Sequence, residues 1–132
     1  MPDSRYYLTQ NVYVSQKDIS EFMIAKSAVR TAIELLLKGT ETSYDEIEAV
    51  YLTGGICVDL SIEALVKTGI IPCELKNKSA YVFNLAESGA FSACFENKLH
   101  ELEDISRRIK TLSLTDNEAF EESFVLNTFF EE

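Results

Sequence analysis

Hydrophobic and polar residues follow two different periods along this chain, and these predict short strands joined to helices. Apolar side chains three or four residues apart predict a long helix over residues 16–38, beginning after Ser15 and ending at Gly39. Ser15 and Asp18 form a capping box at its start, with Asp where Glu or Gln is commoner. The predicted inward stripe of this helix consists of Ile19, Phe22, Val29, Ile33 and Leu36, with Met23 and Leu37 at its margin.

The remaining pattern predicts strands that alternate with helices. Strand-like runs lie at residues 6–14, 49–53, 80–83 and 111–114, and helices are predicted at 62–68, from 84 to about 110, and at 116–130. The helix that begins near residue 84 has an apolar stripe typical of a protein core, made of Phe95, Leu99, Leu102, Ile105 and Ile109. The terminal helix places Phe120, Phe124 and Phe129 inward. The chain is therefore expected to be one α/β domain without a linker or an internal repeat.

The length and composition fit a single packed domain. A chain of 132 residues with 46% hydrophobic residues can bury roughly two-thirds of the surface that its unfolded form exposes. It has no apolar stretch of about 18 residues, and its first ten residues, MPDSRYYLTQ, do not resemble a signal peptide. We therefore expect a soluble, cytoplasmic protein.

The charge narrows the class of partner. Twelve basic against twenty-two acidic side chains give a formal charge of −10, which repels nucleic acid and anionic membranes. Basic or neutral protein surfaces are better partners. Cys57, Cys73 and Cys94 form no CxxC pair, so neither a disulfide framework nor a zinc site is expected. We expect reduced, partly buried thiols and no metal ligands.

Gly54 and Gly55 are the most suggestive positions for chemistry. They end the strand at 49–53 and precede a helix that Ser61 can cap. Two interpretations stay open, because the pair can hold an anion near a helix N-terminus or can only turn the chain. The chain contains no GxxxxGK[ST], GxGxxG, HExxH or GxSxG motif. No catalytic residue is predicted, although a nucleophilic Cys57 remains a minor alternative.

Lys26 is unusual because it falls within the apolar stripe of the long helix, with Arg30 four residues later. One interpretation is a lysine whose stem packs while its ammonium group reaches water. The other is a cation that points into a cleft for an anionic ligand. Farther along, Asn84 and Glu87 repeat the capping pattern. Small residues at Ala86, Gly89, Ala90 and Ala93 would let a backbone or ligand approach closely.

Five segments in order resemble one family of proteins. They read VYVSQKDISEFMIAKSAVRTAIELLL, SYDEIEAVYLTGG, SIEALVKTGIIP, NLAESGA and VLNTFF. Together they resemble the C-terminal half of the reductive activators of corrinoid proteins, from about residue 12 to residue 132. That region is similar to the actin, sugar-kinase and chaperone ATPase superfamily. The resemblance implies a single lobe of that fold, a small mixed sheet packed with helices.

The resemblance also implies a function. Such activators use ATP and an electron from an iron–sulfur domain to reduce the cobalt of a corrinoid partner protein. The ferredoxin cysteines and the first ATPase lobe do not occur in this chain, which resembles one lobe of a longer protein or a naturally short relative. It is therefore not expected to act as an enzyme alone. ATP with magnesium would bind in the intact protein, and the iron–sulfur cluster would lie on a separate N-terminal domain.

The superfamily pattern assigns residues to the nucleotide. Gly54 and Gly55 match its strand-end glycine pair, Lys26 and Arg30 match its basic helix, and Asn84 and Gly89 match a second small-residue segment. The chain departs from the usual Gly-Gly-Phe-Gly-Asn by reading Ile56-Cys57-Val58 after the pair. The alternative function is accordingly a degenerate lobe that no longer binds nucleotide and serves as an interaction or dimerisation module. If the lobe binds nucleotide, we expect Lys26 and the glycine pair to face one shared hollow.

Overall fold

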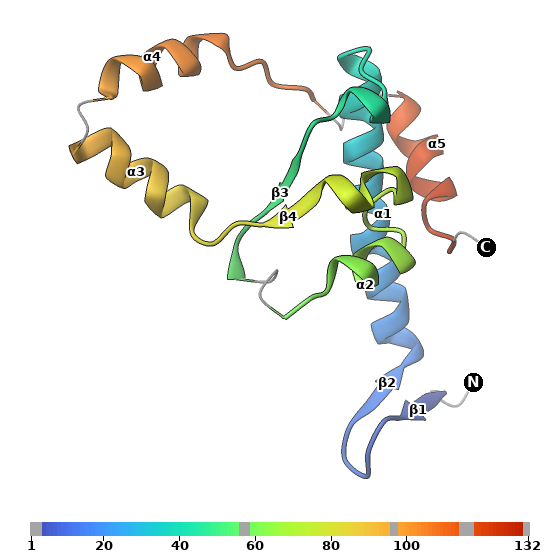
Figure 1. Cartoon of the computed structure of the whole chain (residues 1–132). Helices are drawn as coiled ribbons and strands as arrows, with labels where there is room; N and C mark the ends of the chain where they lie inside the picture. Colours follow the sequence, from blue (N-terminus) through green and yellow to red (C-terminus); the bar gives the residue numbers. More distant parts are fainter. Residues whose placement is uncertain (1–3, 56–58, 96–97, 114–117, 131–132) are drawn as a thin grey trace.

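A computed structural model describes residues 4–55, 59–95, 98–113 and 118–130 (Figure 1). Its elements in chain order are β1 (Arg5–Tyr7), β2 (Tyr13–Ser15), α1 (Gln16–Gly39), the 3-10 helix η1 (Tyr44–Glu46), β3 (Val50–Leu52), α2 (Ile62–Lys67), the 3-10 helix η3 (Cys73–Lys78), β4 (Ser79–Tyr81), α3 (Leu85–Phe95), α4 (Leu99–Arg108) and α5 (Glu118–Leu126). The predicted α/β class is confirmed.

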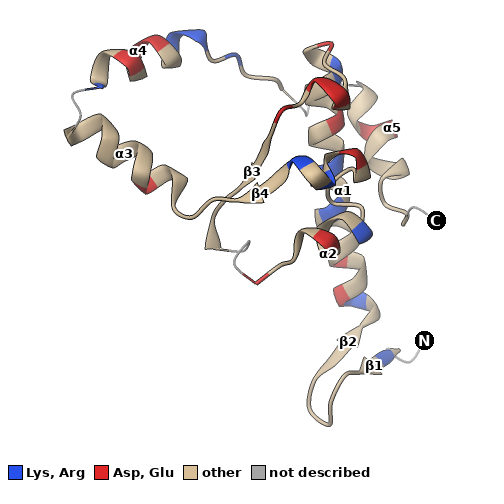
Figure 2. Ribbon diagram, in the orientation of Figure 1, with Lys and Arg blue, Asp and Glu red and all other residues tan. Residues whose placement is uncertain are grey.

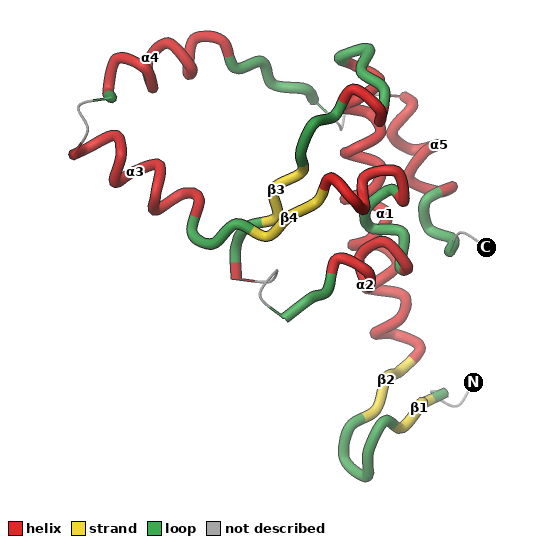
Figure 3. Tube along the Cα trace, in the orientation of Figure 1, coloured by secondary structure: helices red, strands yellow, loops and turns green. Residues whose placement is uncertain are grey.

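The described strands form two separate two-stranded sheets (Figure 3). β1 and β2 pair antiparallel, with Tyr6 opposite Val14. β3 and β4 pair parallel, with Tyr51 opposite Ala80, and the chain between them passes through α2 and η3. The parallel pair matters most for function, because it brings the carboxyl ends of both strands to the same edge.

Helix α1 begins and ends as the sequence predicts. The backbone N–H of Asp18 donates to Ser15 Oγ (3.2 Å), and the backbone N–H of Ser15 donates to Asp18 Oδ2 (2.8 Å), which completes the capping box. The backbone N–H and the hydroxyl group of Ser15 both donate to the Asp18 carboxylate, and these two hydrogen bonds lower the pKa of Asp18. Helix α5 lies alongside α1 (Figure 1).

The buried face of α1 is not the predicted apolar stripe. Ile19, Phe22, Val29 and Leu36 are exposed. The buried residues of α1 are instead mostly polar, namely Lys26, Ser27, Arg30, Thr31 and Leu35. The cause is α5 and the segment that follows it, which offer backbone carbonyl groups and the side chain of Asn127 to this polar face. Hydrogen bonding to a particular neighbour, rather than hydropathy, therefore decides which side of α1 is covered.

A small apolar core lies beside the polar contact. Leu65, Ile71 and Leu75 are buried within it. Half-buried apolar side chains from α1, η1, β3 and the neighbourhood of α2 pack against them; these are Ile33, Tyr44, Ile47, Val50, Leu52, Val66 and Ile70. Burial of these side chains stabilises the crossover between β3 and β4, and so fixes the edge at which the two strands end.

Residues 84–110 do not form the single helix that the sequence predicts. They form α3 and α4, which project from the rest of the molecule as an arm (Figure 1); we call residues 85–108 the arm. Its apolar stripe, predicted to be core, is exposed at Phe95, Leu99, Leu102 and Ile105, and Ile109 just beyond it is exposed as well. Residues 111–113 form no strand, and Leu114 of that predicted strand lies outside the described residues.

The molecule exposes much more surface than a compact protein of its mass. Its accessible area is 10554 Å², whereas a compact monomer of 14.9 kDa exposes about 7,000 Å². The excess is roughly 3,500 Å². Across the described ranges, no helix combines the length and the apolar character that a membrane span requires.

Candidate functional site

The candidate site lies where β3 and β4 end. A hollow of about 100 Å³ is lined by Gly54, Gly55, Phe83 and Asn84. The strands stay together at this edge because the backbone N–H of Val82 donates to the carbonyl oxygen of Leu52 (2.9 Å). Ligands of open α/β sheets commonly bind outside the carboxyl ends of parallel strands. Three predicted site residues, Gly54, Gly55 and Asn84, are thus brought together.

The glycine pair leaves this edge open. Gly54 has a φ of +100°, a conformation that glycine adopts without the steric cost that a Cβ brings. A Cβ built on Gly54 or on Gly55 would meet no atom within 4 Å. The pair therefore turns the chain and also leaves free space above its own backbone, so the two interpretations of the sequence are compatible.

Asn84 shapes the opposite wall of the hollow. It has a φ of +49°, in the left-handed region that Asn tolerates better than most residues. Its side-chain Nδ2 donates to Glu87 Oε2 (2.8 Å), so the amide points toward the first turn of α3. The carboxylate of Glu87 is therefore bound to a residue that lines the hollow, and it adds negative charge near the hollow.

A second hollow follows along α3. It has a volume of about 310 Å³ and is lined by Glu87, Ser88, Phe91 and Ser92. Pockets that enclose a whole small molecule usually measure about 300–1,000 Å³. The hollow at the bend is too small for a nucleotide and suits one of its groups. A complete nucleotide would need the second hollow or another surface as well.

Lys26 does not share the hollow at the glycine pair, so the expectation that both face one cleft is wrong. Its side chain is buried, with 2% exposure. Nζ donates to the carbonyl oxygen of Asn127 (3.0 Å) and to that of Phe129, and lies 5.0 Å from the centre of the Phe130 ring. Its stem passes under Gly69, where a Cβ would come within 3.0 Å of Cε. The ammonium group therefore binds the segment that directly follows α5.

Arg30 and Gly89 also lie away from the bend. Arg30 Nε donates to Glu34 Oε1 (2.7 Å), and Glu34 Oε2 accepts from Asn127 Nδ2 (2.8 Å). Arg30 thus belongs to the contact between α1 and α5. Gly89 lies within α3 and is not among the residues that line either hollow. Contact of Lys26, Arg30 or Gly89 with a nucleotide stays a prediction from the family pattern.

Two cysteines can be placed. Cys73 and Cys94 are free, as predicted, but both are exposed rather than partly buried. Cys57, with Ile56 and Val58, lies outside the described residues. Within the described ranges, no group of three His, Cys, Asp or Glu side chains could hold a metal ion.

Two residues of these sites were missed from the sequence. Phe83 lines the hollow, and its position directly after a predicted strand and before Asn84 could have indicated this. Asn127 binds Thr31 Oγ1 (3.1 Å) and Glu34 through its side-chain amide. Nothing local predicts the role of Asn127, because its partners are 96 and 93 residues away in sequence.

The geometry defines a mixed α/β lobe with an open edge at the ends of two parallel strands. Comparison with known families shows which family this lobe belongs to. The family described as the C-terminal domain of RACo, the ASKHA domain, matches residues 2–132. The chain belongs to this family, and the resemblance found in its sequence is confirmed. A search of curated proteins finds no match.

Proposed function

We propose that this chain is the C-terminal lobe of an ATP-dependent reductive activator of corrinoid proteins, and that its glycine bend contacts the nucleotide. Family membership supports the first part. The hollow between Gly54, Gly55, Phe83 and Asn84 carries the second. Backbone N–H groups at an open glycine turn can approach a phosphate or ribose closely, which a side chain at either position would hinder.

The size of the hollow limits what the lobe does alone. At about 100 Å³ it holds roughly three water volumes, so it forms one wall of a nucleotide cleft. Phosphoryl transfer requires metal and phosphate groups to be held from both sides. We therefore propose weak nucleotide binding and no hydrolysis by this lobe alone. In the intact activator, the other ATPase lobe would complete the cleft that holds ATP with magnesium, and an iron–sulfur domain and a corrinoid protein would be the redox partners.

Glu87 sets a preference within this proposal. Its carboxylate is held near the hollow by Asn84 and would repel a nearby phosphate. The uncharged adenosine portion of a nucleotide therefore suits this edge better than its phosphates do. Phe91, which is exposed on the second hollow, offers an aromatic face on which a base can stack.

Thermal unfolding with and without magnesium-ADP tests the proposal. Ligand that binds only the folded chain raises the melting temperature by mass action, by an amount equivalent to about 2.7 kcal/mol at a hundredfold excess over Kd. Gly55→Ala should remove this rise while leaving the unliganded melting temperature unchanged, because the new Cβ meets open space at a φ outside the left-handed region.

Gly39→Ala is the matched control. Its Cβ would make an ordinary 3.6 Å contact with Leu112, and neither residue lines the hollow, so the rise with magnesium-ADP should persist. A flat response of the unmodified chain up to millimolar nucleotide would contradict the proposal. So would an equal response of the Gly55→Ala variant.

One observation favours a second candidate function, an interaction module that no longer binds nucleotide. The arm exposes apolar side chains that a protein surface could cover. The same titration separates the candidates, because an interaction module gives no thermal response to nucleotide and keeps its response to a protein partner.

A further inference from the structure

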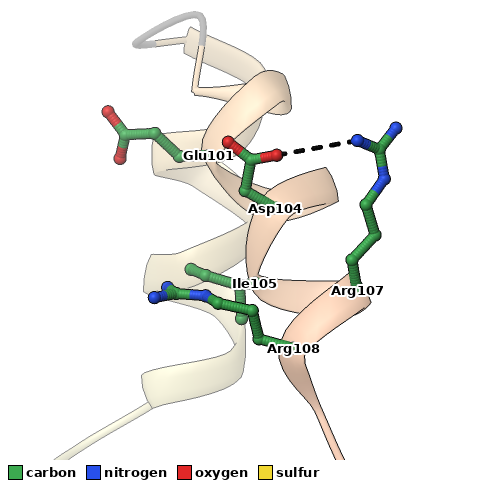
Figure 4. Close-up of a pocket in the computed structure, with 5 residues that line it drawn as sticks. All are labelled: Glu101, Asp104, Ile105, Arg107 and Arg108. Carbon is green, nitrogen blue, oxygen red and sulfur yellow. Dashed lines mark ion pairs between the residues drawn. The ribbon is translucent and has the colours of Figure 1, made fainter.

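Two hollows of this chain differ in the number of elements that form them. A groove of about 530 Å³ is lined by Glu101, Asp104, Ile105, Arg107 and Arg108. All five residues lie on α4, whose acidic residues come first and whose arginines come at its end (Figure 2). Asp104 points toward Arg107, with the two charged groups 3.8 Å apart (Figure 4). The hollow at the glycine bend is smaller, but the ends of two strands form it, so its shape depends on contacts between elements.

The segments that form the hollow at the bend carry no charged residues. Residues 49–58 and 79–86 contain no Asp, Glu, Lys or Arg, and β3 and β4 are accordingly tan in Figure 2. Ion pairs between these two segments are therefore impossible. Their relative position must come from backbone pairing and from neutral polar side chains. Backbone pairing places Leu52 opposite Tyr81 at the ends of both strands.

Tyr81 supplies a neutral side-chain contact at this edge. It is the last residue of β4, and its Oη donates a hydrogen bond to the carbonyl oxygen of Leu60. Leu60 directly precedes Ser61, whose Oγ accepts from the backbone N–H of Ala64 (3.1 Å) and so caps α2. The hydroxyl group of Tyr81 therefore ties the start of α2 to the end of β4.

This hydrogen bond connects the two walls of the hollow. The glycine pair, which forms one wall, lies between Leu52 and Leu60 in the sequence. Tyr81 holds the chain on both sides of the pair, by backbone pairing at Leu52 and through its hydroxyl group at Leu60. The opposite wall begins at Phe83, only two residues after Tyr81. One residue thus helps to set the spacing between the two walls.

We propose that Tyr81 is a positioning residue of the nucleotide site, an inference that rests on the proposed function. Its hydroxyl group keeps the glycine bend in the conformation that receives the ligand. Tyr81 is not among the four residues that line the hollow, so it acts through the bend and does not touch the nucleotide. A binding segment that is already held in place loses less conformational entropy when the ligand arrives, and this raises the affinity.

Tyr81→Phe tests this role, because it keeps the aromatic ring and removes only the hydroxyl group. An NMR titration of the 132-residue chain should give a Kd for magnesium-ADP about fivefold above that of the unmodified chain, the ratio that corresponds to one ordinary hydrogen bond. Without nucleotide, the backbone order parameters of Gly54 and Gly55 should fall, while that of Leu75 in the core stays the same. A residue that only stabilised the fold would not loosen the bend selectively.

Tyr51→Phe is the matched control. It removes the same hydroxyl group from the neighbouring strand β3, at a side chain that is 63% exposed. The Kd for magnesium-ADP and the order parameters of the bend should therefore stay unchanged. The melting temperature of each variant checks that it is folded.

The possible outcomes separate this inference from the proposed function. An unchanged Kd for Tyr81→Phe, while magnesium-ADP still binds the unmodified chain, would overturn this inference alone. Unchanged order parameters at the bend, or an equal effect of Tyr51→Phe, would overturn it as well. Absence of binding to the unmodified chain would overturn the proposed function, and this inference with it.

Discussion

The contact between α1 and α5 buries polar residues, whereas the arm exposes apolar ones. Ser27 and Thr31 are fully buried at the first, beside a buried lysine. Phe91 and Phe95 stack on each other in the arm, with ring centres 4.5 Å apart, and stay 59% and 75% exposed. Burial in this chain is thus set by which neighbour a helix meets.

Hydrogen bonds of Lys26, Ser27 and Asn127 hold the polar contact together. An ammonium group removed from water is costly unless it is hydrogen-bonded. The carbonyl oxygens that Lys26 reaches follow the end of α5, where the helix dipole is negative and favours a cation. The arm makes no comparable polar contact with the other described residues, and its large apolar side chains stay exposed.

Lys26→Met should have the largest effect on stability. Methionine can fill the space of the stem, but the carbonyl groups of Asn127 and Phe129 lose their donor. We expect the free energy of unfolding to fall by about 3 kcal/mol, as measured by urea denaturation. Lys67→Met, at an exposed position, should change it by less than about 0.5 kcal/mol. Similar values for both variants would contradict the comparison.

Asn127→Ala should rank second. It removes the hydrogen bonds from Nδ2 to Thr31 and Glu34 at a part-buried site. The expected loss is about 1–2 kcal/mol, measured in the same denaturant titration. Asn77→Ala, on an exposed position of η3, is the matched control and should be near neutral. An unchanged midpoint for Asn127→Ala would mean that the contact does not depend on this amide.

Phe95→Ser should have little effect on the dilute monomer, although it replaces a large apolar residue. The side chain is already mostly exposed, so we expect a loss below about 0.5 kcal/mol. Hydrogen exchange of the amides in α3 and α4 provides the companion measurement, and they should exchange faster than those of α1. A loss above about 2 kcal/mol would show that the arm is packed in solution.

The smallest expected effect is on the pH dependence of stability, and it comes from the capping boxes at the starts of α1 and η1. Hydrogen bonds from Ser15 and Ser43 lower the pKa values of Asp18 and Glu46. Their contribution is present above the unfolded-state pKa and is lost as the pH falls through the lower, folded-state pKa. Asp18→Asn should flatten the melting temperature profile below about pH 5, whereas Glu101→Gln in α4, where Lys98 provides no side-chain cap, should not. Equal melting temperature profiles for the two variants would contradict this prediction.

Local signals in the sequence predicted local structure well. Ser15 and Asp18 fixed the start of α1, and Gly54 with Asn84 indicated the edge where β3 and β4 end. The break between α3 and α4 was missed because Phe95 and Leu99 keep a spacing of four residues across it. A helical period therefore runs across Lys98, which belongs to neither helix.

Long-range contacts could not be predicted. Lys26 was predicted to share a hollow with a glycine pair 28 residues away, but it binds carbonyl groups more than 100 residues away. No pattern within α1 shows which of its sides α5 will cover. The family resemblance supplied the ATPase-like lobe and the assignment of the nucleotide to the bend, and the structure corrected the position of the lysine.

Backbone amide NMR during titration with magnesium-ADP tests the central claim most directly. The account predicts that the amide signals of Gly54, Gly55 and Asn84 shift together, while those of Asn127 and Phe129 around the Lys26 ammonium group stay unchanged. Shifts confined to the α1–α5 contact, or no shift at millimolar ligand, would contradict the assignment of the nucleotide to the edge of β3 and β4.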